Sequence, residues 1–335
     1  MRTYSAFNAP IKVFGIADFY KRRSFARLPD EVIKAVPSLE FLGRRSSGGR
    51  VCFRTNSSTL CIKIELETLS VDIGMSIYAS QSAFVYTGSR QDLRLLGLVN
   101  PPNYETKVLQ NSFELSGEMQ DITVLVPRNE IIKSIDVSID DNAELCEPTP
   151  YKYSKPILYY GSSITEGGCC CNPINCYNAM ISRHLDVDYY NFGFSGSCKG
   201  ESALADFFNT LDFSIFVLDY DHNAPDVAHL EATHEPFYKK IREANKSVPI
   251  LMLTRPRPYL TEEETQRKDV VKKTYENAIA SGDKNVYFFD GPSFFKGFAD
   301  SEHCFIDGCH PNDLGFFKMA EALEPTIKAL LEGLK

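Results

Sequence analysis

Two short stretches of the chain carry residues that together could perform acyl transfer. GSSITEGG, at residues 161–168, contains two adjacent serines, and DGCHPND, at residues 307–313, contains a histidine three positions after an aspartate. A serine hydroxyl becomes a nucleophile when a histidine accepts its proton and an acid orients that histidine. Ser163, His310 and Asp307 could supply these three groups, although either stretch alone is also typical of an ordinary turn.

The residues around His310 predict a fixed loop at the start of a helix. Asp307 is close enough in a turn to hold Nδ1 of the imidazole. Pro311 biases the residue before it toward extended backbone, and Asn312 can cap the helix that follows. On its own this pattern is more typical of a turn with a satisfied histidine, so the catalytic hypothesis depends on the combination with Ser163.

The second half of the chain alternates apolar strands with helices, which predicts a parallel, doubly wound sheet. Thr261 and Glu264 form a capping box for the clearest helix, and Gly282 marks its end. Pro325 should kink or break the last helix. The strands are expected at residues 156–161, 187–194, 213–220, 248–255 and 285–291, and the helices at 176–185, 203–211, 236–246, 261–282 and 312–334.

Ligands of such sheets bind at the carboxyl ends of the strands. GSSITEGG follows the first strand, and NFGFSGS and LDYDHNAPD follow the second and third, so the three loops should open on one crevice. Gly196 could bring a backbone N–H close to a developing oxyanion, and Asn223 could offer its amide. The first loop matches neither the nucleotide-binding glycine patterns nor the G-x-S-x-G nucleophile elbow.

The first half of the chain predicts an all-β sandwich or jelly roll, because short β-branched segments alternate with turn-forming residues. One helix is expected at residues 30–36. The three prolines of residues 146–156 suggest a linker, so we expect domains at 1–148 and 149–335. The strand segments are 11–17, 50–55, 60–66, 73–79, 83–89, 122–127 and 135–140.

Composition excludes several classes of function. The net charge is −8 and the charges are interspersed, which argues against a nucleic-acid partner. No apolar stretch reaches the roughly 18 residues of a transmembrane helix, and the first residues lack the apolar core of a signal peptide, so a cytoplasmic location is expected. CCCNPINC and HCFIDGCH lack the C-x-x-C pairs of structural zinc sites, so the ten cysteines predict thiols, with no metal and no cofactor.

Taken together, these blocks resemble the SGNH (GDSL-type) hydrolase family. GSSIT, NFGFSG, DHN and DGCHPN stand in the family's order. The resemblance implies a flavodoxin-like sheet and ester hydrolysis with no required metal. It implies Ser163 as nucleophile, His310 as base and Asp307 as the acid that orients the base. It also implies an oxyanion hole formed by the Ser163 N–H, Gly196 and Asn223.

Two positions depart from the family's usual pattern. Ser162 stands where the family has an aspartate, and DYDHNAP replaces the usual Gly-x-Asn-Asp block. His222 could therefore face the crevice in place of Asn223. Arg255 and Arg257, or Arg44 and Arg45 from the first domain, could contact an anionic substrate, although surface positions are the simpler interpretation. Of Tyr159 and Tyr160, one is expected in the core and one at the rim.

The whole chain, with its expected β-sandwich in front, resembles SGNH enzymes of the carbohydrate-esterase kind. We expect a serine esterase that forms an acyl-enzyme and removes short acyl groups, above all acetyl, from a small-molecule or oligosaccharide ester. The small, polar crevice loops favour short chains, since each buried methylene is worth about 0.8 kcal/mol. The alternatives are a lipase or thioesterase for longer chains and a catalytically silent carbohydrate-binding protein. No membrane partner is expected, and a homo-oligomer stays open.

Overall fold

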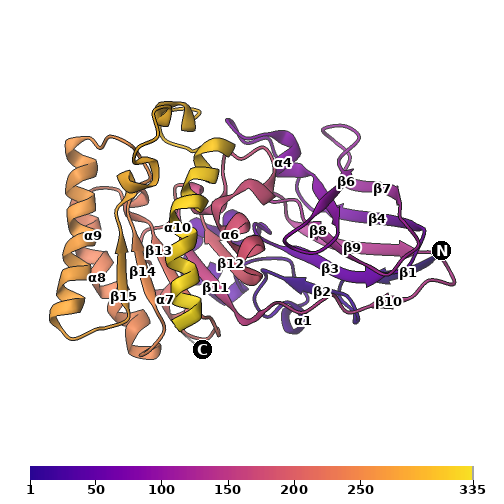
Figure 1. Ribbon diagram of the computed structural model, residues 1–335, viewed down its shortest axis with the longest axis horizontal. Coiled ribbons are helices and arrows are strands. Elements are labelled where there is room, and N and C mark those ends of the chain that lie inside the picture. The colour runs from indigo at the N-terminus through magenta and orange to yellow at the C-terminus, as the bar shows by residue number, and fades with distance from the viewer. Residues whose placement is uncertain (334–335) are drawn as a thin grey trace. The chain divides into compact units, whose positions relative to one another are not determined.

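The computed structural model describes residues 1–333 and divides them into two compact units (Figure 1). We call them the N-terminal and C-terminal units. Each borrows a short piece of chain from the other half of the sequence. The N-terminal unit comprises residues 1–29, 41–153 and 171–174, and the C-terminal unit comprises residues 30–40, 154–170 and the described residues from 175 onward.

The N-terminal unit contains two antiparallel sheets, with strand orders β1-β9-β4-β7 and β10-β3-β8-β5-β6, and β2 pairs with β3. Buried side chains of both sheets, such as Phe53 and Ile62, share one core, as in a sandwich. The predicted β-sandwich is therefore confirmed. The strands are β1 (Arg2–Ser5), β2 (Lys12–Phe14), β3 (Arg50–Thr55), β4 (Thr59–Leu66), β5 (Ala83–Thr87), β6 (Arg94–Val99), β7 (Val108–Glu114), β8 (Gln120–Leu125), β9 (Ile132–Ile139) and β10 (Leu145–Cys146).

One predicted strand of this half of the chain is wrong. Residues 73–79 form a turn that leads into helix α4 (Ile77–Gln81), because the Ser76 hydroxyl accepts the Ala79 N–H and caps a helix. The helix predicted at residues 30–36 is confirmed as α2 (Asp30–Ala35), while α1 (Phe19–Arg22) and α3 (Glu40–Arg44) were not predicted.

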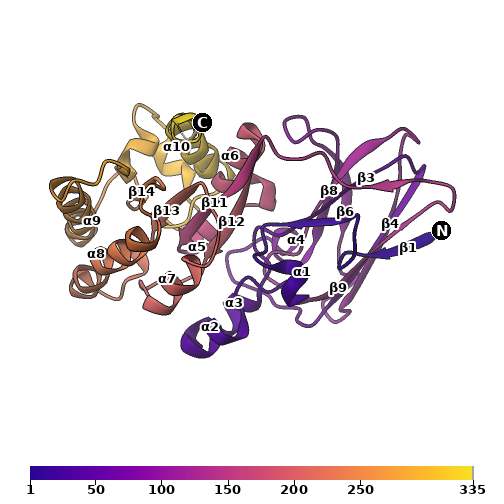
Figure 2. The same ribbon diagram turned by 90° about the horizontal axis from the view of Figure 1, so that it is seen from below.

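The C-terminal unit is a five-stranded parallel sheet of order β12-β11-β13-β14-β15, which confirms the predicted flavodoxin-like arrangement. Helices α6 and α10 cover one face and α7, α8 and α9 cover the other (Figure 2). The strands are β11 (Tyr153–Gly161), β12 (Val187–Gly193), β13 (Ile215–Asp219), β14 (Ile250–Leu253) and β15 (Val286–Phe289). The helices are α5 (Ser163–Glu166), α6 (Tyr177–Leu185), α7 (Ser202–Phe208), α8 (Val227–Ala244), α9 (Glu262–Ala280) and α10 (Asp313–Gly333).

Two helices differ from the sequence-based expectation. Helix α8 begins at Val227 rather than at residue 236, because the Asp226 carboxylate accepts the His229 N–H and starts the helix earlier. Helix α10 runs through Pro325 to Gly333 without a break, since buried residues on both sides of the proline, Leu323 and Ile327, keep the helix packed in the core of the unit. The last residue predicted for α10, Leu334, lies outside the described residues.

The central strands are buried on both faces. All five residues of β13 are buried, as expected for a parallel strand covered by helices. Tyr159 and Tyr160 are both fully buried, so the expectation of one rim position is wrong: the sheet has no exposed face there. The Tyr160 hydroxyl donates to Glu201 at 2.9 Å.

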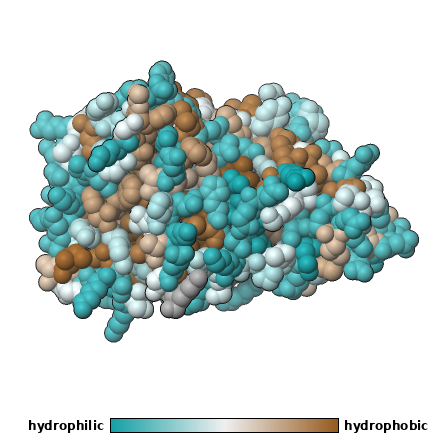
Figure 3. All heavy atoms as spheres, in the orientation of Figure 1, coloured by the Kyte–Doolittle hydropathy of each residue, from teal (hydrophilic) through white to brown (hydrophobic). Residues whose placement is uncertain are grey.

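Outside the core, the surface is mainly polar. Hydrophilic residues, interspersed with small hydrophobic patches, cover most of the face drawn in Figure 3. Within residues 1–333, no helix combines the length and apolar character that crossing a membrane requires.

Candidate active site

Ser163, His310 and Asp307 form one hydrogen-bonded line in the C-terminal unit. Ser163 Oγ lies 2.9 Å from Nε2 of His310, and Nδ1 of His310 lies 2.7 Å from Oδ2 of Asp307. The His310 backbone N–H also donates to Oδ1 of Asp307 at 2.7 Å. Ser163 is 7% exposed. This is the geometry that a serine nucleophile, a histidine base and an acid that orients the histidine require.

A tight strand-to-helix connection positions Ser163. Ser163 is the first residue of α5, directly beyond β11, and the Ser162 hydroxyl caps this helix by accepting the Ile164 N–H at 3.1 Å. A side chain at Gly161 would collide with Thr165 and with the backbone of Asp219. Only glycine therefore allows β11, α5 and β13 to approach this closely, which places Ser163 where the strand order reverses.

His310 lies on a loop braced from both sides. The loop follows η5 (Ser301–Cys304), and the Ile306 N–H donates to the His310 carbonyl at 3.1 Å. Asn312 accepts the Gly315 N–H at 3.1 Å and so caps α10, as predicted, and its amide also donates to the His303 carbonyl at 2.7 Å. The loop is therefore fixed to the start of α10.

Gly196 and Asn223 lie on loops tied to the strand end that carries Ser163. Gly196 takes a positive φ of 65° in a turn closed by the Ser197 N–H and the Phe194 carbonyl at 3.0 Å. The Phe194 N–H donates to the Gly161 carbonyl at 2.9 Å. Asn223, the last residue of η3 (Asp221–Asn223), accepts the Cys198 N–H at its Oδ1 at 3.5 Å. Its amide nitrogen is thereby left to donate elsewhere.

The site holds its acid ionised and its base unusually basic. Partial burial alone would raise the pKa of Asp307, but hydrogen bonds from the backbone and ring of His310 lower it to about 2. The Cys309 side chain, more than Asp307, raises the pKa of His310 to about 9 against the effect of burial. Burial works against a Cys309 thiolate, yet His310 and the positive charge of Arg255 lower the pKa of this thiol.

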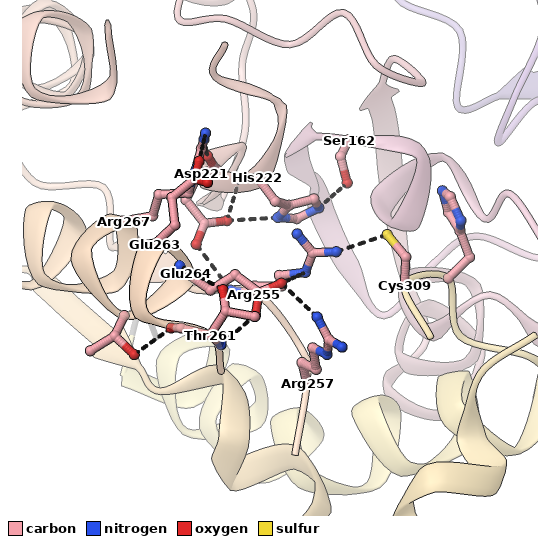
Figure 4. A network of polar contacts seen from close by, with 12 residues as sticks. Ser162, Asp221, His222, Arg255, Arg257, Thr261, Glu263, Glu264, Arg267 and Cys309 are labelled. Carbon is pink, nitrogen blue, oxygen red and sulfur yellow. Dashed lines mark hydrogen bonds and ion pairs between the residues drawn. The ribbon is translucent and has the colours of Figure 1, made fainter. Parts of the chain in front are cut away.

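A second serine, histidine and aspartate line up in the same unit (Figure 4), and this serine, Ser162, directly precedes Ser163. Ser162 Oγ lies 2.5 Å from Nε2 of His222, and Nδ1 of His222 lies 2.7 Å from Oδ1 of Asp221. The His222 side chain is 3% exposed, and both of its ring nitrogens are bonded to Ser162 and Asp221. The adjacent Asp221 and His222 and the serine doublet were the signals in the sequence, but they do not reveal which way the side chains point.

The described residues contain two groups that could supply three metal ligands each, with ligand atoms within 4.8 Å of one another. In both groups the histidine already uses its two ring nitrogens in the hydrogen bonds given above. Neither His310 nor His222 therefore has a ring nitrogen left to bind a metal without breaking those bonds. The groups are Asp307 with Cys309 and His310, and Asp219 with Asp221 and His222.

Three of the four arginines considered as substrate contacts form ion pairs inside their own units. Arg255 and Arg257 lie 3.2 and 2.8 Å from Glu264. Arg45 is buried in the N-terminal unit and pairs with Asp72 at 3.0 Å. Binding of an anionic substrate by these side chains would therefore have to compete with, or add to, existing ion pairs.

A groove of about 670 Å³ opens beyond the carboxyl ends of β14 and β15. We call it the aromatic groove. The Tyr259 ring in its wall is 72% exposed. Phe295, another wall residue, packs against Phe305 of the loop that carries His310, with ring centroids 5.2 Å apart. The groove is lined among others by Pro258, Tyr259, Asp290, Phe295, Phe298 and Ser301.

Sequence profiles of two families match the chain. The GDSL-like lipase/acylhydrolase family matches residues 154–328, and the N-terminus of the SGNH-hydrolase-type esterases matches residues 3–145. The first match covers the whole predicted catalytic set. No match to this chain was found among curated proteins.

Several solved structures share the fold. A candidate GDSL-like lipase from Bacteroides ovatus superposes with a TM-score of 0.85 at 22% identity, over 99% of this chain and 98% of that one. A salicylyl-acyltransferase from a tetracycline biosynthetic pathway gives 0.78 at 20% identity, over 98% of both chains. A family two carbohydrate esterase from Clostridium thermocellum, in complex with cellohexaose, gives 0.64 at 14% identity, over 85% of this chain and 93% of that one.

Proposed function

Because the chain belongs to the GDSL-like lipase/acylhydrolase family and is a carboxylic ester hydrolase, we propose that it is a serine esterase that removes acetyl and similarly short acyl groups from carbohydrates. The observation that carries the proposal is the unbroken hydrogen-bonded line from Ser163 through His310 to Asp307.

In this mechanism Ser163 Oγ attacks the ester carbonyl while its proton passes to Nε2 of His310, and Asp307 stabilises the resulting imidazolium. The N–H groups of Ser163 and Gly196 and the amide of Asn223 donate to the oxyanion. The intermediate collapses to an acyl-enzyme as His310 returns the proton to the leaving alcohol. Water, deprotonated by His310, then attacks the acyl carbon. As this second intermediate collapses, the bond from the acyl carbon to Ser163 Oγ breaks, His310 returns the proton to Oγ, and the acid is released.

A short acyl group fits the chemistry of the loops around Ser163. They read GSSITEGG, FSGSCKGES and DYDHNAPD, and small, polar side chains offer little apolar surface for a long chain. A binding site for octanoate would need that surface, because each buried methylene contributes about 0.8 kcal/mol. The limited apolar surface supports acetyl or butyryl over longer chains.

The aromatic groove supports a carbohydrate as the alcohol part of the ester. Its wall combines the exposed Tyr259 ring with polar groups of Asp290 and Ser301, and binding pockets commonly combine apolar walls with a few polar groups that fix the ligand's orientation. The groove lies beyond the carboxyl ends of β14 and β15, and Ser163 follows the carboxyl end of β11 in the same parallel sheet. The carbohydrate esterase with cellohexaose shares this fold, which adds to the support.

The test compares kcat/KM for acetyl, butyryl, octanoyl and palmitoyl esters of one leaving group, with acetylated oligosaccharides as a second series and Ser163→Ala as the inactive control. We expect acetyl or butyryl to lead and the acetylated oligosaccharides to release acetate. A rise in kcat/KM with chain length would favour the lipase or thioesterase alternative. Binding of oligosaccharides without turnover of any ester would favour the silent binding protein.

A further inference from the structure

The second line, Ser162–His222–Asp221, is closed off from substrate. Ser162 is fully buried, and its hydroxyl lies between the Ile164 N–H and Nε2 of His222. An ester carbonyl cannot reach this oxygen, so the line is not a second nucleophilic site. What the imidazole does there is to hold the residue directly before Ser163.

The line continues beyond Asp221 toward the other catalytic loop. Oδ2 of Asp221 accepts the Arg255 backbone N–H at 3.1 Å, and the Arg255 guanidinium donates to the Cys309 sulfur at 3.0 Å. Cys309 directly precedes His310. The path therefore begins one residue before the nucleophile and ends one residue before the base, and Figure 4 shows its members converging from separate loops.

The same network also fixes the segment that carries Asn223. The Arg267 guanidinium donates to the carbonyls of Asp221 and Ala224, at 2.9 and 2.8 Å, on either side of Asn223. Arg267 is itself buried and paired with Glu263 at 2.7 Å. Asp221 thus joins three loops: those of the nucleophile, the oxyanion amide and the base.

We propose that His222 is a positioning residue, which sets the approach of Ser163 Oγ to His310 Nε2. It acts on the nucleophile through Ser162 and on the loop of the base through Asp221 and Arg255. The inference rests on the proposed roles of Ser163 and His310. In a packed interior a hydrogen bond missing from this path shifts one catalytic loop against the other. A misplacement of about 1 Å at reacting atoms can cost about 100-fold in rate.

The experiment compares His222→Phe with a matched control, His234→Phe. The His234 side chain is also buried in the same unit, and it bonds Thr274 at 3.0 Å rather than any member of the path. We expect His222→Phe to lower kcat about 100-fold while KM and the melting temperature stay close to those of the control. The rate at which a fluorophosphonate labels Ser163 should fall in parallel, because that reaction needs the same base.

A second variant guards against misfolding. Ser162→Ala removes only one hydroxyl. Like His222→Phe, it should lower kcat while KM stays nearly unchanged. Because both substitutions break the same contact, the double variant should be no slower than the slower single variant, whereas independent effects would multiply. Three results would overturn the inference. They are a full kcat in Ser162→Ala, a double variant whose loss of kcat is the product of the two single losses, and a loss of kcat in His234→Phe equal to that in His222→Phe.

The outcome for Ser163→Ala separates this inference from the function on which it rests. An active Ser163→Ala variant would overturn the proposed function and the positioning role together. An inactive Ser163→Ala variant combined with full kcat in His222→Phe would overturn the positioning role alone.

Discussion

Replacing Cys309 with serine should move the pH dependence of ester hydrolysis toward lower pH. In the proposed mechanism His310 acts as a base only when it is neutral, so kcat/KM should rise as the pH passes through its pKa. The Cys309 side chain is the main cause that raises this pKa to about 9. Serine keeps an oxygen that can accept the Arg255 hydrogen bond but does not form an anion. The positioning path should therefore survive, while the part of the pKa rise that Cys309 causes should be lost.

The magnitude follows from the fraction of neutral imidazole. With a pKa of about 9, about 1% of His310 is neutral at pH 7, whereas about 76% is neutral at the ordinary value of about 6.5. The substitution leaves Asp307, which lies 2.7 Å from Nδ1 of His310, in place, so this carboxylate should keep the pKa of His310 above the ordinary value. The gain in kcat/KM at pH 7 should therefore be substantial but below about 75-fold.

The assay is kcat/KM for an acetyl ester across about pH 5 to 10, corrected for spontaneous hydrolysis. Cys146→Ser, in the N-terminal unit, serves as the control and should leave the profile unchanged. An unshifted or higher midpoint in Cys309→Ser would refute the reasoning, because it would mean that the thiol does not hold the proton on His310.

Three further substitutions test other parts of the structure. Asp307→Asn should keep the fold and lower kcat by about 10³- to 10⁴-fold, since the imidazole would lose its orienting acid; near-normal kcat would move that role to another residue. Asn223→Ala should lower kcat by about 10²- to 10³-fold at an unchanged KM, and a raised KM alone would assign the amide to substrate binding. Tyr259→Ala should raise KM for acetylated oligosaccharides but not for a small aryl acetate, and equal effects on both would remove the aromatic groove from carbohydrate binding.

Local patterns were sufficient to predict that the proposed catalytic side chains Ser163, His310 and Asp307 lie together. In a parallel sheet the carboxyl ends of all strands meet at one edge, so the residues after three strands could be grouped without knowing any contact. The contact between Asp307 and His310 could be predicted without any knowledge of the sheet, because residues three apart in a turn can bring their side chains together. The capping box of Thr261 and Glu264 was likewise a short-range pattern, and it is present as predicted.

The positioning path could not be predicted in the same way. His222 reaches Ser162 because Gly161 pairs with Asp219 across β11 and β13, and that register is a property of the assembled sheet. The failed strand at residues 73–79 has a more local origin. Its apolar residues suggested a strand, but Ile73 is fully exposed, and the hydroxyl of Ser76 was enough to start a helix instead.

The two units exchange short pieces of chain, and this limits how the protein can be cut. A fragment that begins after residue 149 would lack α2 and the rest of residues 30–40, which belong to the C-terminal unit. The complementary fragment would lack residues 171–174, which belong to the N-terminal unit. Neither half of the sequence is therefore a complete module, and a chimera that transfers the catalytic half to another protein would have to carry residues 30–40 with it.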